Sequence, residues 1–217
     1  MAVVPAKDAE TTIASVVEGL RAVREDLDVI VVDDGSSDAT GARARLAGAR
    51  VLRHEVNRGK GAALQSGFDA AVGAGAEVVL ALDADGQHPP ASVPELLAAL
   101  EGADLVVGSR NADRRGMPWL RRMTNDVTSW WVSRLAGQRI DDSQSGYRAI
   151  RAEVIRRVRP ASTRFEYESE FLVAAARAGF RIGSAPIPTL YNAPGSHIDP
   201  LRDTIRFIRF VWRHLWS

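Results

Sequence analysis

The sequence predicts an α/β protein in which helices flank a mostly parallel sheet. Short apolar runs rich in β-branched residues indicate strands that are buried on both faces, at residues 29–32, 78–80 and 105–107. Stretches with helical periodicity alternate with these runs, at residues 11–24, 39–46, 61–72 and 92–100. Because continuously apolar strands need cover on both faces, this alternation favours a parallel sheet between two helical layers.

Local signals mark where several of these elements begin. The helix at 39–46 follows a Ser-Ser-Asp triplet at 36–38, and such side chains commonly cap the first turn of a helix. The helix at 92–100 opens on Ser92 with Pro94 in its first turn, another common arrangement at a helix start. The boundaries therefore agree with the periodicity.

The composition is that of an ordinary soluble domain. The chain has 217 residues, of which 46% are hydrophobic and 25% charged, and its net charge of +1 gives no reason to expect a nucleic-acid partner. It has no cysteine and no signal-peptide pattern, which fits a cytoplasmic protein. No apolar run reaches the about 18 residues of a membrane-spanning helix. Without repeats or linkers, we expect a single domain over residues 1–217.

Basic and apolar residues gather together in the second half of the chain. Five arginines lie between residues 110 and 122. An apolar stripe at helical spacing follows, formed by Leu120, Met123, Val127, Trp131 and Leu135. Residues 200–217 have a similar stripe, with four arginines beside tryptophan and phenylalanine. Simple packing on the domain would explain either helix, but the second has the composition of a helix that lies at a membrane surface.

The sequence DADGQ at residues 83–87 predicts a metal site. At the end of a strand, residues two apart point the same way, so Asp83 and Asp85 converge and need a cation or a proton between them. Together with the oxygen of Gln87 they suit a hard divalent ion, Mg²⁺ or Mn²⁺. An EF-hand loop is excluded, because the glycine is fourth rather than sixth and Pro94 is twelfth. The alternative is an acidic turn that caps the next helix.

Two further segments place polar groups where ligands commonly bind. Asp33 and Asp34 follow the strand at 29–32, at the edge where open α/β sheets hold their ligands, and could accept hydrogen bonds from a nucleotide. Lys60 lies between two glycines at a helix start and could bind a phosphate. The segment matches neither a P-loop nor a dinucleotide fingerprint, so a solvated lysine is the alternative.

Eight strings occur in order along the chain: VVPAKDAETTI, VVDDGSSDAT, NRGKGAAL, DADGQHPP, VVGSR, DSQSGYRAI, FEYESEF and SHIDPLRDTIRFIR. In this order they resemble the family-2 glycosyltransferases, specifically the dolichyl-phosphate-mannose-synthase-like branch. The resemblance implies a Rossmann-like GT-A fold. It also implies an inverting, metal-dependent enzyme that transfers a hexose from a nucleotide sugar, of the GDP-mannose or UDP-glucose type, to a polyprenyl phosphate.

The resemblance assigns residues to the metal and to the donor. The metal, Mg²⁺ or Mn²⁺, would be held by Asp83, Asp85 and Gln87. The nucleotide sugar would be bound by Pro5, Asp8, Asp33, Asp34, Lys60, Asp83, Ala84 and Asp85. A metal and a lysine at this place would stabilise the charge that develops on the departing nucleotide.

A second group of residues matches the acceptor positions of the family. Arg110, Arg121, Asn125 and Arg148 would hold the acceptor phosphate, and Arg110, Arg121 and Asp142 are the expected catalytic residues. Asp142 would act either as a base or as a group that orients Arg148. A phosphate acceptor is already an anion, so the transfer itself needs no strong base.

The resemblance also divides the chain by function. Residues 1–110 would form the nucleotide-sugar and metal half, 110–199 the acceptor half, and 200–217 a helix on the membrane surface, which predicts a peripheral protein at the inner face of the membrane. The family usually has Asn-Glu where this chain has Asp8-Ala9, and this departure leaves the nucleotide base open. Two further matches have no assigned role, Glu170 and His197.

Two other functions stay open at this point. The same fold would serve a hydroxyl acceptor on a saccharide or a small molecule, and Asp142 would then be required as a base. A catalytically inactive module that binds membrane surfaces would use only the arginine-rich helices. The clustered carboxylates at residues 83–87 argue against that module, since it has no use for them.

Overall fold

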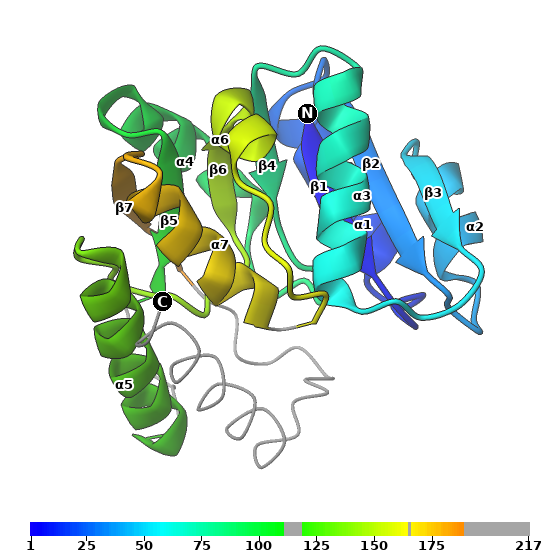
Figure 1. Ribbon diagram of the computed structural model, residues 1–217. Helices are drawn as coiled ribbons and strands as arrows, with labels where there is room; N and C mark the ends of the chain where they lie inside the picture. The colour runs from blue at the N-terminus through cyan, green and yellow to red at the C-terminus, as the bar shows by residue number, and fades with distance from the viewer. Residues whose placement is uncertain (111–118, 165, 189–217) are drawn as a thin grey trace.

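The computed structural model describes residues 1–110, 119–164 and 166–188, apart from the side chains of Leu120 and Arg121. Seven strands form one sheet in the order β3-β2-β1-β4-β6-β5-β7 (Figure 1). Their bounds are β1 Ala2–Ala6, β2 Val29–Asp34, β3 Arg50–His54, β4 Val78–Ala81, β5 Leu105–Ser109, β6 Arg148–Arg151 and β7 Ile182–Pro186. All neighbouring strands pair in parallel except β6, which is antiparallel to both β4 and β5.

Two layers of helices cover the sheet and bury its two faces separately (Figure 1). The helices are α1 Ile13–Val23, α2 Thr40–Leu46, α3 Lys60–Gly73, α4 Val93–Ala99, α5 Trp119–Ala136, α6 Ala152–Arg157 and α7 Glu166–Arg177. Short 3₁₀ turns flank α4, at Pro90–Ser92 and Leu100–Gly102. The core on one face includes residues of α3, α5, α6 and α7, and the core on the other includes residues of α1, α2 and α4. The predicted α/β class with its mostly parallel sheet is confirmed.

The predicted strands and helices of the first half are all present, with ends shifted by one or two residues. The N-cap position of α2 is Ala39, and the carboxylate of Asp38, one residue earlier, accepts a hydrogen bond from the amide of Thr40 at 2.9 Å. No strand was predicted at β1, β3, β6 or β7. The residues of β3 are largely exposed or half-buried at the sheet edge, and β6 has only four residues with arginine at both ends. These two strands lack the continuous apolar run that identified β2, β4 and β5.

The apolar stripe predicted for α5 is only partly the buried face of that helix. Trp131 and Leu135 pack against the core as expected, but Met123 and Val127 are 50% and 51% exposed. The first half of α5 buries polar side chains instead, namely Asn125, Thr128 and Ser129. Simple packing on the domain therefore does not explain this half of the stripe. Polar partners on the loop before β6 select the inward face: the hydroxyl of Ser129 accepts a hydrogen bond from the amide of Ser143 at 2.9 Å.

Several predictions lie outside the described residues. They concern the membrane-surface helix at 200–217, His197, and the arginines at positions 114 and 115. Within the described ranges, no helix combines the length and the apolar character needed to cross a membrane.

Close packing of α3 on the sheet yields a first prediction. A Cβ atom on Gly67 would lie 2.3 Å from Cγ1 of Val3 and 3.1 Å from Cγ2 of Val32. Because β-branched side chains have little freedom to move, Gly67→Ala should lower the free energy of unfolding by about 1–3 kcal/mol. Gly73→Ala is the matched control on the same helix, since no atom lies within 4 Å of the added carbon. Urea denaturation measures the free energy of unfolding of both variants. Equal values for Gly67→Ala and Gly73→Ala would contradict the tight contact at Gly67.

Candidate active site

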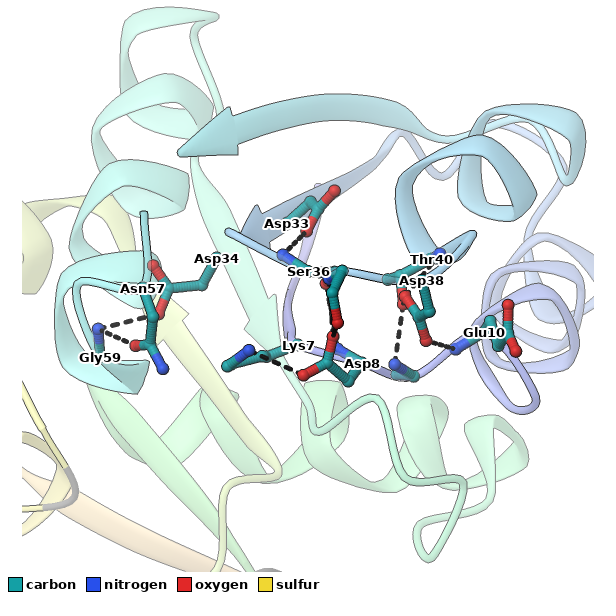
Figure 2. Close-up of polar contacts among 12 residues, drawn as sticks. Lys7, Asp8, Glu10, Asp33, Asp34, Ser36, Asp38, Thr40, Asn57 and Gly59 are labelled. Atoms are coloured by element: carbon teal, nitrogen blue, oxygen red, sulfur yellow. Dashed lines mark hydrogen bonds and ion pairs between the residues drawn. The ribbon is translucent and has the colours of Figure 1, made fainter. Parts of the chain in front are cut away.

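The predicted donor residues meet at one edge of the sheet, where β1, β2 and β4 end. Hydrogen bonds tie the loops after β1 and β2 together (Figure 2). The amide of Asp8 donates to Oγ of Ser36 at 3.0 Å, and the amide of Ser37 donates to Oδ1 of Asp8 at 2.8 Å. The hydroxyl of Thr12 donates to the carbonyl oxygen of Ala84 at 2.6 Å, which joins the start of α1 to the loop after β4. These loops therefore form one hydrogen-bonded unit.

Asp8 is the exposed acid of this unit. Its backbone has a φ of +49°, a conformation that non-glycine residues rarely adopt and that tends to occur at functional sites. A hydrogen bond from Lys7 at 2.7 Å, together with the amide of Ser37, lowers the pKa of Asp8 to about 2. Asp8 is therefore a charged, accessible acceptor, whereas Pro5 lies buried within β1.

Asp33 and Asp34 are buried and already have partners. The carboxylate of Asp33 accepts from the amide of Ser36 at 2.9 Å and from Nη1 of Arg53 at 2.8 Å. That of Asp34 turns toward the loop before α3 (Figure 2), where it accepts from the amide of Gly59 at 2.8 Å. The two acids thus shape the turn after β2 and the start of α3, and direct contact with a nucleotide stays a prediction.

Lys60, the first residue of α3, joins three elements through its ammonium group. Its Nζ atom lies 2.7 Å from Oδ1 of Asp83, after β4, and 2.8 Å from Oε2 of Glu168 on α7. Burial favours the neutral form of each partner, but the opposite charges outweigh it, so the pKa of Lys60 is raised and that of Asp83 is lowered. The solvated-lysine alternative is excluded by these contacts, because Lys60 is fixed beside the predicted metal ligand.

Asp85 lies next to this charged group and behaves differently from Asp83. Burial, and then the negative charge of Asp83, raise the pKa of Asp85 above its ordinary value of 3.8. Its Oδ1 atom accepts from the amide of Gln87 at 2.9 Å, across a turn in which Gly86 has a φ of +70°. The raised pKa of Asp85 indicates that the positive charge nearby does not balance the negative charges of both Asp83 and Asp85. A divalent cation would supply the missing positive charge.

The oxygen ligands at residues 83–87 therefore fit a hard divalent ion that has few protein ligands. Over the residues that the structure describes, no three histidine, cysteine, aspartate or glutamate side chains gather as a ready-made metal cage. The predicted set has two carboxylates and the amide oxygen of Gln87. Mg²⁺ and Mn²⁺ sites of this kind take their remaining ligands from water and substrate phosphates.

The predicted acceptor residues form a second cluster at the same edge. Arg110, directly after β5, makes a bidentate pair with Asp142, with Nε to Oδ2 at 2.7 Å and Nη2 to Oδ1 at 2.8 Å. The side chain of Asn125 also bonds Asp142. Burial would raise the pKa of Asp142, but Arg110 outweighs it and lowers that pKa. Arg121 lies on α5, and its side chain is outside the described residues.

Arg148 is buried and faces backbone carbonyl groups. Its guanidinium donates to the carbonyl oxygens of Ser145, Glu168 and Ser143 at 3.0, 2.9 and 3.2 Å. These bonds fix the loop before β6 against α7, and no ion pair joins Arg148 to Asp142. The predicted contact of Arg148 with phosphate stays a prediction.

Two buried polar atoms near these clusters lack a hydrogen-bond partner within the described part of the chain, Nδ1 of His88 and Oδ1 of Asn125. The charges of Asp83, Arg110, Asp85 and Asp142 all act on His88, so its ring lies near both clusters. Burial lowers the pKa of His88. Buried polar atoms usually have partners, so orphans here favour a site that binds a polar ligand.

Sequence reasoning missed Glu168 and His88 as members of the site. Glu168 occurs in the string FEYESEF, but only the packing of α7 against α3 places it beside Lys60. His88 directly follows the predicted ligand Gln87, and that position was the one available signal. Glu170, which matched the family without a role, accepts from the amides of Ala161 and Ser162 at 2.9 and 3.1 Å.

The sheet with its single antiparallel strand and the acidic edge after β4 define a GT-A-type glycosyltransferase. The chain matches the family described as Glycosyl transferase family 2 over residues 1–159, and it belongs to that family. It is therefore an enzyme of the hexosyltransferase type, as its sequence predicted.

Curated relatives lie in the polyprenyl-phosphate branch of the family. The chain is 35% identical over 179 residues to an undecaprenyl-phosphate mannosyltransferase of Micrococcus luteus, covering 77% of this chain and 74% of the relative. It is 30% identical over 214 residues to a UDP-N-acetylglucosamine–dolichyl-phosphate N-acetylglucosaminyltransferase of Methanococcus voltae, covering 88% and 85%.

A solved structure supports the fold assignment. Glucosyl-3-phosphoglycerate synthase of Mycobacterium tuberculosis, in complex with Mn²⁺, UDP and phosphoglyceric acid, superposes with a TM-score of 0.74 at 25% identity. The match covers 99% of this chain and 76% of that structure. The predicted GT-A fold is confirmed.

The Arg110–Asp142 pair yields a second prediction. Asp142→Asn removes a buried charge that holds Arg110, so it should lower the free energy of unfolding at neutral pH by about 2–3 kcal/mol. The pKa of Asp142 is below its ordinary 3.8 in the folded state, so this stabilisation is present above pH 3.8 and is lost as the pH falls through the lower value. Urea denaturation at several pH values should show the difference between variant and wild type narrowing in acid.

Asp141→Asn is the matched control for that measurement. Asp141 pairs at 2.8 Å with Arg139, whose side chain is almost fully exposed. Such surface pairs contribute at most about 1 kcal/mol. Equal decreases in the free energy of unfolding for Asp141→Asn and Asp142→Asn would contradict a larger contribution of the buried Arg110–Asp142 pair.

Proposed function

We propose that this enzyme transfers a hexose, with inversion, from a nucleotide sugar to a polyprenyl phosphate at a membrane surface, with a divalent metal ion at residues 83–87. The observation that carries the proposal is the structure of α5. This helix presents Asn125 to the Arg110–Asp142 pair on its inner side, and large apolar side chains to solvent on its outer side. Such a helix suits an acceptor with an anionic head and a lipid tail.

The donor side of the proposal rests on Lys60 and the acidic turn after β4. Asp83, Asp85 and Gln87 would hold Mg²⁺ or Mn²⁺, and the ion, when bound, neutralises charge on the leaving diphosphate. Lys60 would add a positive charge beside the same oxygens. Asp8 and the backbone of the joined loops would contact the nucleotide, and Asp33 and Asp34 would keep those loops in shape.

On the acceptor side, Arg110 would orient the attacking phosphate. A phosphate oxygen forms the new bond to the anomeric carbon while the bond from that carbon to the diphosphate oxygen breaks. No proton needs to be removed, because the acceptor is already ionised. This suits Asp142, whose two oxygens are both occupied by Arg110. Asp142 is then a positioning residue, and Arg121 and Arg148 are further candidates for the cationic surroundings.

The outer face of α5 supports a location at the membrane. Trp119, Met123, Val127 and Trp130 are between 50% and 73% exposed and recur at helical spacing. Tryptophan is favoured at membrane–water interfaces because its ring is apolar and its N–H is polar. We therefore propose that the enzyme is peripheral, at the inner face of the membrane, and that α5 contributes to binding there beside the predicted helix at 200–217.

The donor is the open part of the proposal. We propose a donor of the GDP-mannose or UDP-glucose type, and the relatives' names include both mannosyl and N-acetylglucosaminyl transfer. A hydroxyl acceptor is the rival function, and it would require Asp142 as a base. The bidentate bond to Arg110 argues against that role, since it stabilises the ionised carboxylate and so weakens it as a base.

A transfer assay tests the proposal. Radiolabelled GDP-mannose, UDP-glucose and UDP-N-acetylglucosamine are each offered with Mn²⁺ or Mg²⁺ and polyprenyl phosphate in detergent, or with saccharide acceptors. We expect labelled lipid from one donor, loss of product in EDTA, and a loss of roughly a hundredfold or more for Asp85→Ala. Asp69→Asn, in a surface pair with Arg159, should keep the wild-type rate. Product only on saccharides, or turnover that ignores EDTA, would refute the proposal.

Vesicle binding tests the role of α5 separately. Each tryptophan side chain buried in the interface contributes about 1.5–3 kcal/mol, so Trp119→Ser with Trp130→Ser should weaken binding to anionic phospholipid vesicles at least about tenfold. Leu46→Ser is the control, because Leu46 on α2 is also exposed. Co-sedimentation with vesicles measures all three proteins. Unchanged binding of the tryptophan variant would remove α5 from the membrane contact.

A further inference from the structure

Lys60 holds a carboxylate that a metal ion would need. The ammonium of Lys60 contacts Oδ1 of Asp83 at 2.7 Å. Both oxygens of Asp83 lie against the backbone of Gly146, since an added Cβ atom there would be 2.6 Å from Oδ2 and 2.8 Å from Oδ1. A divalent ion bound to this carboxylate would therefore lie close to the ammonium of Lys60 and repel it. The two cations compete for the same carboxylate.

Glu168 is a second anionic partner of Lys60. Its Oε2 atom lies 2.8 Å from Nζ of Lys60, and its side chain is only 10% exposed. The position of Glu168 is fixed from both sides, since Arg148 donates to its carbonyl oxygen at 2.9 Å and Phe171, one turn along α7, packs on Phe68 of α3. Glu168 is thus a fixed anion that can keep Lys60 paired when Asp83 releases it.

The charges explain why such an exchange would be needed. A lysine as little exposed as Lys60 is costly to bury without an anion. If Asp83 were its one partner, metal binding would leave the ammonium unpaired beside a divalent ion. With Glu168 in place, Lys60 keeps one carboxylate and gains the oxygens of a diphosphate as new partners.

We propose that Lys60 is the resident cation of Asp83 in the metal-free enzyme, that the divalent ion displaces it, and that Glu168 is the positioning residue that retains the displaced ammonium beside the donor diphosphate. This inference rests on the proposed function, because it takes residues 83–87 as the metal site. It adds that metal and donor bind cooperatively: each favours the position of Lys60 that the other requires.

Binding of Mn²⁺ tests the exchange without any turnover. The signal of free Mn²⁺ in electron paramagnetic resonance gives the metal affinity, alone and with UDP or GDP present. Lys60→Met frees Asp83, so it should bind Mn²⁺ alone about tenfold more tightly than wild type. Glu168→Gln leaves Lys60 with Asp83 as its one anion, so it should bind Mn²⁺ alone about tenfold more weakly, the scale of a lost outer-shell partner. The deficit of Glu168→Gln should shrink when the bound nucleotide offers Lys60 its diphosphate.

Control variants separate the exchange from loss of charge or of folding. Arg156→Met and Glu153→Gln remove the same charges from a surface pair at 3.9 Å and should leave Mn²⁺ affinity at the wild-type value. Lys60→Arg keeps the cation and should restore the weak binding of Mn²⁺ alone. Circular dichroism identifies a variant that does not fold. If Lys60→Met does not fold, the weaker Mn²⁺ binding predicted for Glu168→Gln still tests the exchange.

The outcomes distinguish this inference from the proposed function. Equal or weaker Mn²⁺ binding by folded Lys60→Met, or unchanged binding by Glu168→Gln, would overturn the exchange while the metal site stands. If wild type binds no Mn²⁺ but folded Lys60→Met does, the metal site stands and the competition by Lys60 is supported. If neither protein binds Mn²⁺ with either nucleotide, the metal site of the proposed function fails, and the exchange fails with it.

Discussion

The ammonium of Lys60 between Asp83 and Glu168 is the interaction on which the arrangement of the site depends. It joins the start of α3, the loop after β4 and the start of α7, three segments that meet at one edge of the sheet. Buried acids at such an edge must find a cation or N–H groups, because water cannot solvate them there. The same requirement pairs Asp142 with Arg110 and places Asp34 against the amide of Gly59.

The antiparallel strand β6 explains how donor and acceptor groups come together. It is inserted between β4 and β5, so the loop that precedes it reaches the same edge at which those two strands end. Asp142 enters the site on this loop, while Asp83 follows β4 and Arg110 follows β5. If β6 were parallel to its neighbours, the loop before it would lie at the opposite edge of the sheet. The ring of His88 packs against that of Tyr147, with the centroids 5.6 Å apart and the ring planes tilted by 34°.

Helix α5 reverses the usual distribution of polarity over part of its length. Its inner side carries Asn125 and Ser129, which form hydrogen bonds with the loop before β6. Its outer side carries Met123 and Trp130. A helix that only packed on the domain would bury the apolar side and expose the polar one. The proposed lipid-phosphate acceptor accounts for both sides together, because its head needs polar groups and its tail needs an apolar surface.

The sequence by itself determined the fold class, the family, and the edge of the sheet at which the acids gather, because strand periodicity and the residues just after a strand are local properties. It also identified Asp83, Asp85, Arg110 and Asp142 as site candidates. Only the tertiary structure decided which charged groups pair and which side of α5 is buried: Lys60 bridges Asp83 and Glu168, Arg110 pairs with Asp142, and the first half of α5 has a polar inner face. These pairings depend on the order of strands and on helix docking, which bring together residues far apart in the chain and leave no periodic signal in it.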